Sequence, residues 1–162
     1  MAITDLRSLF EHHLQELYYM ELKLIDTLSE LASKTGHAEA SDAFSAHRRE
    51  TEGQARRLEQ VFEMAGFQVL TQASEGFEGL ENERQRFSEE EPSPAIRDLF
   101  HVGVGEKVER YEIGGYEGLI ELAQQLKLGE AADLLRQSLR EEEAALHKLR
   151  ELSARLVKEA AT

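Results

Sequence analysis

Residues 10–31 read FEHHLQELYYMELKLIDTLSEL, and this segment has the clearest periodicity in the chain. Large apolar residues recur in it at alternating spacings of four and three, which is the period of one face of an α-helix. That face consists of Phe10, Leu14, Leu17, Glu21, Leu24, Leu28 and Leu31. The pattern predicts a helix of roughly eight turns from about Thr4 to Lys34. A single glutamate interrupts its apolar face.

Three further segments show a helical period. The second predicted helix runs from about Ala38 to Ala65, the third from Pro94 to about Leu128, and the fourth from about Glu130 to Lys158. Gly66 and Gly129 are expected to end the second and third helices, because glycine readily adopts the left-handed conformation that closes a helix. The inner face of the second helix is the least apolar, with Ala40, Ala43, Phe44, His47, Glu50 or Thr51, Gln54, Leu58 and Val61.

The segment between the second and third helices, residues 67–92, has no sustained period. Phe77, Leu80 and Phe87 in it could pin a short helix against the other helices. The segment is long enough to travel the length of a bundle, so the third helix should start parallel to the second. The sequence therefore predicts one all-α domain over residues 1–162, a ferritin-like four-helix bundle with a long crossover between helices two and three.

Composition excludes several classes of function. The 32 acidic residues outnumber the 19 basic ones and give a net charge of −13, with the cations scattered singly, so nucleic acid is not an expected partner. The chain has no cysteine, so any metal must be held by oxygen and nitrogen ligands. No apolar run reaches the length of a membrane span, and the first residues do not resemble a signal peptide. We therefore expect a cytoplasmic protein without a membrane association.

Each predicted inner face contains one glutamate where the pattern asks for an aliphatic residue. These residues are Glu21, Glu50, Glu112 and Glu142, and each lies near the middle of its helix. In a bundle the four midpoints meet at one level, so the carboxylates should converge. Unpaired buried carboxylates are costly, but two divalent cations would balance four of them. The pattern therefore predicts a dinuclear metal site.

Other residues could complete this site. His47 lies three residues before Glu50 and is expected to be its nitrogen ligand. Glu109 has the same offset from Glu112 and either adds an oxygen ligand, faces solvent, or pairs with an arginine. We expect hydrogen bonds to the ligating carboxylates from Tyr18, Tyr111 and Tyr116. The remaining histidines are interpreted as surface or capping residues: His12, His13, His37, His101 and His147.

Several short motifs together resemble a known family. They are Leu9-Phe10 with Glu16-Leu17-Tyr18 and Glu21; Ala43-Phe44 with His47, Glu50-Thr51 and Gly53-Gln54; Lys107-Val108-Glu109 with Tyr111-Glu112-Ile113 and Tyr116; and Leu139 with Glu141-Glu142. On these residues the chain resembles the YciF/YciE-like bacterial stress-associated proteins of the ferritin-like superfamily. The resemblance implies a homodimer with a di-iron-type site between the helices, and no defined reaction.

The chain also departs from the ferritin-like pattern. The histidine precedes its glutamate on the second helix, and Leu146 replaces the acidic residue expected one turn after Glu142. The site is therefore poorer in nitrogen than a symmetric di-iron oxidase, and its second metal would be bound weakly or differently.

Two functions from different classes remain open at this point, besides mineral storage, which needs a hollow oligomeric shell that nothing in the sequence shows. The first is a metal-binding protein that holds iron or manganese and acts on O₂ or peroxide in a stress response, with catalytic turnover and catalytic residues unknown. The alternative is a dimeric acidic interaction protein without turnover. Its expected contact residues lie in the crossover: Phe67, Val69, Leu70, Phe77 and Leu80.

Overall fold

The structure is a computed structural model, and it describes residues 3–161. Over this range the chain forms five helices and no strand. The helices are α1 (Leu6–Lys34), α2 (Ala38–Ala65), α3 (Glu75–Glu89), α4 (Pro94–Gln125) and α5 (Gly129–Ala160). The prediction of an all-helical chain is therefore confirmed.

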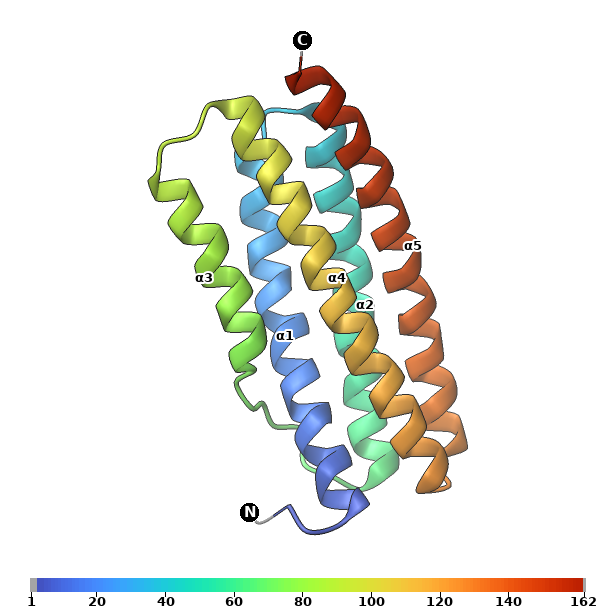
Figure 1. Cartoon of the computed structure of the whole chain (residues 1–162). Helices are drawn as coiled ribbons and strands as arrows, with labels where there is room; N and C mark the ends of the chain where they lie inside the picture. The colour runs from blue at the N-terminus through green and yellow to red at the C-terminus, as the bar shows by residue number, and fades with distance from the viewer. Residues whose placement is uncertain (1–2, 162) are drawn as a thin grey trace.

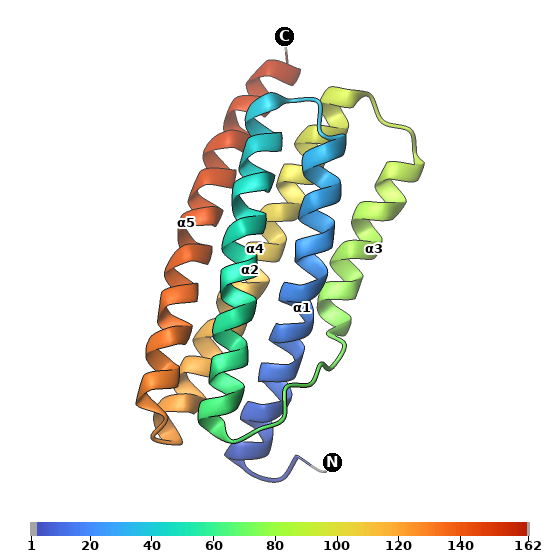
Figure 2. The ribbon, with the colours of Figure 1, turned by 180° about the vertical axis from the view of Figure 1, so that it is seen from behind.

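The four long helices lie side by side, and the short helix α3 lies outside them (Figures 1 and 2). Helix α1 contacts α2 and α4, and α5 contacts the same two helices from the other side. In Figure 1, α1 and α5 run upward while α2 and α4 run downward. The crossover through α3 thus makes α2 and α4 parallel, as the sequence predicts, and brings the middles of the long helices to one level.

Two helix ends show how local sequence sets the turns. Gly66 ends α2 in the left-handed conformation, with φ 70°, and the amide of Phe67 donates back to the carbonyl of Phe62. Helix α4 ends with the same bond pattern, but Lys127 takes the left-handed position with φ 61°. The prediction that Gly129 ends this helix is therefore wrong, because Gly129 is the first residue of α5.

The predicted inner face of α1 is buried at every position. The predicted short helix in the crossover is also present as α3. Its Phe77 is fully buried, and the ring of Phe87 stacks on Phe100 with centroids 3.7 Å apart. On α5 the sequence pattern predicts an inner face of Ala132, Leu135, Leu139, Glu142, Leu146, Leu149 and Leu156. Ser138 and Ala145 are buried in place of Leu139 and Leu146.

Within the described residues, no helix combines the length and apolarity needed to cross a lipid bilayer.

Candidate metal centre

Acidic side chains lie inside the helix assembly at the level where the long helices meet. Glu21 on α1, Glu112 on α4 and Glu142 on α5 have no exposed surface, and Glu109 on α4 is 2% exposed. They are buried because each occupies a position of the helical repeat that faces the core. Glutamate is seldom fully buried unless it is paired, so this cluster needs a chemical explanation.

Four of the buried groups form a compact set. One ligand atom from each of His47, Glu109, Glu112 and Glu142 lies within 4.8 Å of all the others. The Nε2 atom of His47 lies 2.9 Å from Oε1 of Glu109 and 3.9 Å from Oε2 of Glu142. The set offers one nitrogen and three carboxylates from three different helices, which is a donor set that iron, manganese and zinc accept.

Glu21 lies beside this set but outside it. Its carboxylate accepts a hydrogen bond from the hydroxyl of Tyr116, a fully buried residue of α4. Its second oxygen, Oε2, has no hydrogen-bond partner among the described residues. The charge of Glu21 also raises the pKa of Glu112, although burial is the larger cause of that shift. Glu21 therefore extends the acidic cluster toward α1.

Glu50 does not converge with the other carboxylates, and this part of the prediction is wrong. Its side chain is 36% exposed, and the inward position on α2 belongs to Thr51, which is fully buried. Thr51 lies one turn after His47 and donates its hydroxyl to the His47 carbonyl at 3.0 Å. A residue four positions on shares the face of His47, whereas one three positions on is rotated to its edge.

Glu50 still touches the centre through the histidine. Its Oε2 lies 3.4 Å from Nδ1 of His47, and its Oε1 lies 3.8 Å from Nζ of Lys148 at the surface. The fourth buried carboxylate is supplied by Glu109 instead. Of the three alternatives for Glu109, the structure excludes exposure to solvent and an arginine partner, since its contact is with His47.

Only one of the three tyrosines bonds to the cluster. Tyr116 does so, but Tyr18 donates to Glu59 at 2.8 Å and Tyr111 lies 3.2 Å from the hydroxyl of Ser74. Tyr18 is buried, but its ring packs on Phe62 of α2, and Tyr111 is an exposed residue of α4. The prediction for these two residues is therefore wrong.

The interpretation of the five remaining histidines as surface or capping residues is wrong for His101. His37 caps α2 as expected, since its Nδ1 accepts from the amide of Ala40. His101 is only 3% exposed, because the face of α4 on which it lies is covered by α3. A short helix in the crossover was expected, but nothing in its sequence shows which face of α4 it covers.

The buried acids have strongly altered proton affinities. Burial raises the pKa of Glu21 to about 8, although the hydrogen bond from Tyr116 opposes this. Burial likewise raises the pKa of Glu112 well above its ordinary value, and the charges of Glu21 and Glu109 add to the shift. Burial and then the charge of Glu112 raise the pKa of Glu142 in the same way. A charged carboxylate is unfavourable at each position unless a cation is near.

His47 and Glu109 behave as an ion pair. Burial by itself would lower the pKa of His47, but the adjacent Glu109 charge raises it well above its usual value. Burial by itself would raise the pKa of Glu109, but the His47 charge lowers it. Within residues 3–161, His47 is the one cationic side chain in contact with these buried carboxylates, and one positive charge cannot balance four of them.

Carboxylate oxygens without hydrogen-bond partners indicate whether the residues of this cluster fit a metal ion. Among the described residues, neither carboxylate oxygen of Glu112 has a hydrogen-bond partner. Oε2 of Glu109 and the two oxygens of Glu142 have none apart from a proton that these two carboxyl groups can share. Buried polar atoms in native proteins almost always have a partner, and an unplaced ion is one reason for an exception. The donor set and its orphaned oxygens fit a divalent cation.

A small cavity opens beside His47. Its volume is about 50 Å³, and its wall includes His47 and Glu50. The other lining residues are Ala43, Ala46, Ala145, Lys148 and Leu149. His47 is thus the member of the four-residue set that is reached from outside on this side.

Comparison with known proteins places the chain in a family. Residues 5–162 match the family described as "Domain of unknown function (DUF892)". The chain belongs to this family. A curated DUF892 relative, Protein YciF of Escherichia coli strain K12, is 35% identical over 154 residues, which cover 94% of this chain and 93% of YciF. The predicted resemblance to YciF-like proteins is therefore confirmed.

Solved structures agree with the likeness to YciF. The crystal structure of the E. coli stress protein YciF matches with a TM-score of 0.91 and 34% identity, covering 96% of this chain and 99% of that one. YcfI of Rhodopseudomonas palustris matches with a TM-score of 0.88 and 29% identity, covering 91% and 94% of the two chains. A Xanthomonas campestris protein with 19% identity and a TM-score of 0.75 covers 94% of both chains and shares the fold.

Proposed function

We propose that this protein binds divalent iron or manganese at the buried cluster of His47, Glu109, Glu112 and Glu142. The observation that supports this most strongly is the set of carboxylate oxygens that are buried without a hydrogen-bond partner. Without a cation, these acids must either stay protonated or repel one another. A bound cation satisfies the oxygens and removes the repulsion in one step.

Charge counting supports a site for two ions. The four buried carboxylates, Glu21, Glu109, Glu112 and Glu142, contribute −4 when ionised, and two divalent ions contribute +4 while His47 stays neutral. The four-residue set would hold the first ion. Glu21 lies on the Glu112 side of the cluster and, together with Glu112, would hold the second. Glu109 thus takes the place that the sequence assigns to Glu50.

Glu50 has a different part in this proposal. Its carboxylate faces Nδ1 of His47, so the histidine can donate its Nδ1–H outward and keep the Nε2 lone pair for a metal. A carboxylate behind a metal-binding histidine fixes the tautomer and the ring orientation. We therefore propose Glu50 as a positioning residue and not as a ligand.

A redox role is part of the same proposal. When bound, iron or manganese would supply electron transfer to O₂ or peroxide. The chain's own contribution is a dry site: Leu17, Leu24 and Leu119 are buried on neighbouring turns and keep water from the carboxylates. The description of YciF as a stress protein agrees with this chemistry but concerns that relative.

The fold and assembly belong to the proposal as well. The ring of α1, α2, α5 and α4 with an outer crossover supports a ferritin-like four-helix bundle. We expect a homodimer in the cytoplasm, and sedimentation velocity on the purified chain tests the dimer. A dimer would also exclude a storage shell.

The alternative of a metal-free interaction protein finds less support. Three of its expected contact residues, Phe67, Phe77 and Leu80, pack in or against the core, while Val69 and Leu70 are exposed at 43% and 47%. Two exposed apolar residues on a loop are ordinary for a protein surface.

Metal binding is tested by titrating metal-free protein with Fe(II) under argon, and separately with Mn(II), while following thermal unfolding and bound metal. We expect about two ions per chain and a rise in the melting temperature, because a ligand that binds only the folded state stabilises it. The Glu109→Gln variant should lose this response, and Glu63→Gln, a surface change on α2, should keep it. A wild-type protein that neither binds metal nor changes its melting temperature contradicts the proposal.

A further inference from the structure

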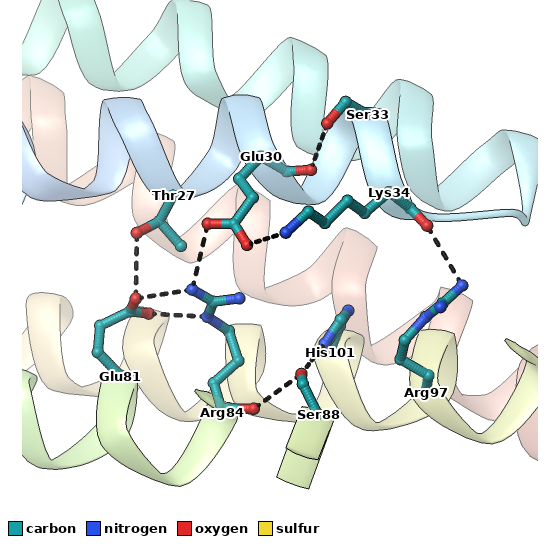
Figure 3. Close-up of polar contacts among 9 residues, drawn as sticks. All are labelled: Thr27, Glu30, Ser33, Lys34, Glu81, Arg84, Ser88, Arg97 and His101. Carbon is teal, nitrogen blue, oxygen red and sulfur yellow. Dashed lines mark hydrogen bonds and ion pairs between the residues drawn. The ribbon is translucent and has the colours of Figure 1, made fainter. Parts of the chain in front are cut away.

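A second polar site lies far from the buried carboxylates, where the C-terminal ends of α1 and α3 meet the first turns of α4 (Figure 3). A cavity of about 490 Å³ opens there between the three helices. Its lining includes Lys34, Arg84, Arg97 and His101, together with Ser88 and Gln85. Lys34 is 13 residues beyond Glu21 on α1, which is roughly 20 Å along a helix.

Arg84 is the most unusual residue of this cavity, because an arginine of an exposed helix is here only 5% exposed. Its Nε and Nη2 atoms donate to Glu81 at 3.4 and 3.1 Å, and Nη2 lies 3.6 Å from Glu30. Figure 3 draws no contact to its remaining terminal nitrogen, which turns toward the side where Lys34 and Arg97 lie. Part of a buried guanidinium is thus free to bind something else.

His101 adds a second unsatisfied group. The side chain is 3% exposed, and its Nε2 lies 3.4 Å from the hydroxyl of Ser88. Its Nδ1 is buried and has no hydrogen-bond partner among residues 3–161. Burial and then the charge of Arg84 lower the pKa of His101, which agrees with positive surroundings. A buried ring nitrogen without a partner is an exception in native proteins.

Arg97 closes the cavity from α4. Its Nη2 donates to the carbonyl of Lys34 at 3.3 Å, and its Nε lies 3.7 Å from the carboxylate of Asp98 without a hydrogen bond. These contacts help to hold the end of α1 against α4. They leave the rest of the guanidinium free to turn toward the cavity.

The wall of this cavity carries three permanent cations and two acids, Glu30 and Glu89. Each cation has an acidic neighbour: Glu30 is paired with Lys34 at 2.8 Å and with Arg84, Glu81 is paired with Arg84, and Asp98 lies near Arg97. An anion would therefore be held by the donor atoms that these pairs leave unused, and not by an excess of positive charge.

We propose that this cavity binds a small anion that carries a carboxylate or a phosphate group. Arg84 and Arg97 have planar donor groups that match the oxygens of either anion, and Lys34 adds a mobile charge. Ser88 and Gln85 supply neutral hydrogen-bonding groups at the wall. The volume lies in the usual range of small-molecule sites, which is about 300 to 1,000 Å³. This site does not depend on metal binding at the buried cluster.

The test is a titration of the full chain with inorganic phosphate and, separately, with citrate, at constant ionic strength set by chloride. Binding is followed by isothermal titration calorimetry and by the NMR signals of the His101 ring. We expect saturable binding of one anion per chain for at least one of the two probes. Binding of phosphate alone, or of citrate alone, identifies which of the two groups the cavity prefers.

Variants locate the binding. Arg97→Gln and Lys34→Gln change side chains that are not buried. Each should lower the affinity for the anion by about tenfold or more, which is the loss expected for a charged hydrogen bond. Arg86→Gln is the matched control, because Arg86 is an exposed cation of α3 that does not line this cavity. Circular dichroism checks that each variant is folded. Absence of saturable binding, or an equal loss in Arg86→Gln, overturns the proposal.

Discussion

The Nε2 atom of His47 lies 2.9 Å from a carboxylate oxygen of Glu109, while its Nδ1 atom lies 3.4 Å from Glu50. The imidazole ring therefore stands between a buried acid on α4 and a half-exposed acid on its own helix. The two ring nitrogens have different surroundings, so the two glutamates should have different effects when each is removed.

Glu109→Gln and Glu50→Gln should separate a ligand from a positioning residue. We expect Glu109→Gln to lose one of the two ions per chain or both, because a carboxylate of the buried set is gone. Glu50→Gln should keep the number of bound ions but lower the metal affinity by about 10- to 100-fold, which is the usual effect of removing a group that hydrogen-bonds to a metal-binding histidine. Metal analysis and competition with a chelator measure both. Loss of both ions in Glu50→Gln would show that Glu50 is a ligand.

Glu112→Leu should make the metal-free protein more stable and at the same time abolish metal binding. Glu112 is fully buried, and neither of its oxygens has a hydrogen-bond partner in the described part of the chain. Replacing a buried acid by leucine should stabilise the metal-free protein by about 1 to 4 kcal/mol and abolish metal binding. Urea unfolding of metal-free protein measures the first effect. The control is Glu117→Leu on the exposed side of α4, which should keep metal binding.

The metal-free protein should lose stability as the pH rises from about 5 to 8. The pKa of Glu21 is about 8 in the folded protein against an ordinary value of 4.5, and burial raises those of Glu112 and Glu142 as well. Below pH 4.5 both states hold these protons, so the acids make no pH-dependent contribution to stability. Above it the unfolded chain releases them while the folded chain retains them, which favours unfolding.

Thermal unfolding across this pH range, with a chelator present, measures the effect. A loss of about 1 kcal/mol would lower the melting temperature by roughly 2 to 4 °C. With Mn(II) in excess the dependence should reverse, because the metal binds ionised carboxylates. A metal-free protein whose stability is constant or rises from pH 5 to 8 would contradict the buried, protonated state of these acids.

The periodicity of the sequence predicted the all-helical fold because apolar residues recur at helical spacing in each long segment. It also predicted that Glu21, Glu112 and Glu142 are buried, since each replaces an aliphatic residue in a regular stripe. The prediction that Glu50 is buried with them is wrong for a geometric reason. Thr51, four positions after His47, shares its face, whereas Glu50, three positions after it, is rotated to the edge of that face.

Other features depended on contacts between helices distant in sequence. The burial of His101 and Arg84 follows from the packing of α3 on the outside of the long helices, and no short-range pattern encodes that. The left-handed Lys127 was missed because lysine is not a usual residue for such a turn.

Tyr116→Phe should lower the stability of the metal-free protein. The Tyr116 hydroxyl donates to Glu21, and both side chains are fully buried. Removing the hydroxyl leaves that carboxylate without this donor, so we expect a loss of about 1 to 3 kcal/mol in the metal-free protein. Tyr111→Phe is the control, because Tyr111 is 44% exposed and contacts Ser74 instead. Urea unfolding compares the two, and equal effects would show that the bond to Glu21 has no special role.

Anomalous X-ray diffraction from crystals grown with Fe(II) or Mn(II), with data collected at the absorption edge of each metal, tests the metal centre most directly. The account predicts anomalous density among His47, Glu109, Glu112 and Glu142, with a second peak on the Glu21 side of Glu112. Crystals that contain metal but show no density at these carboxylates would contradict it.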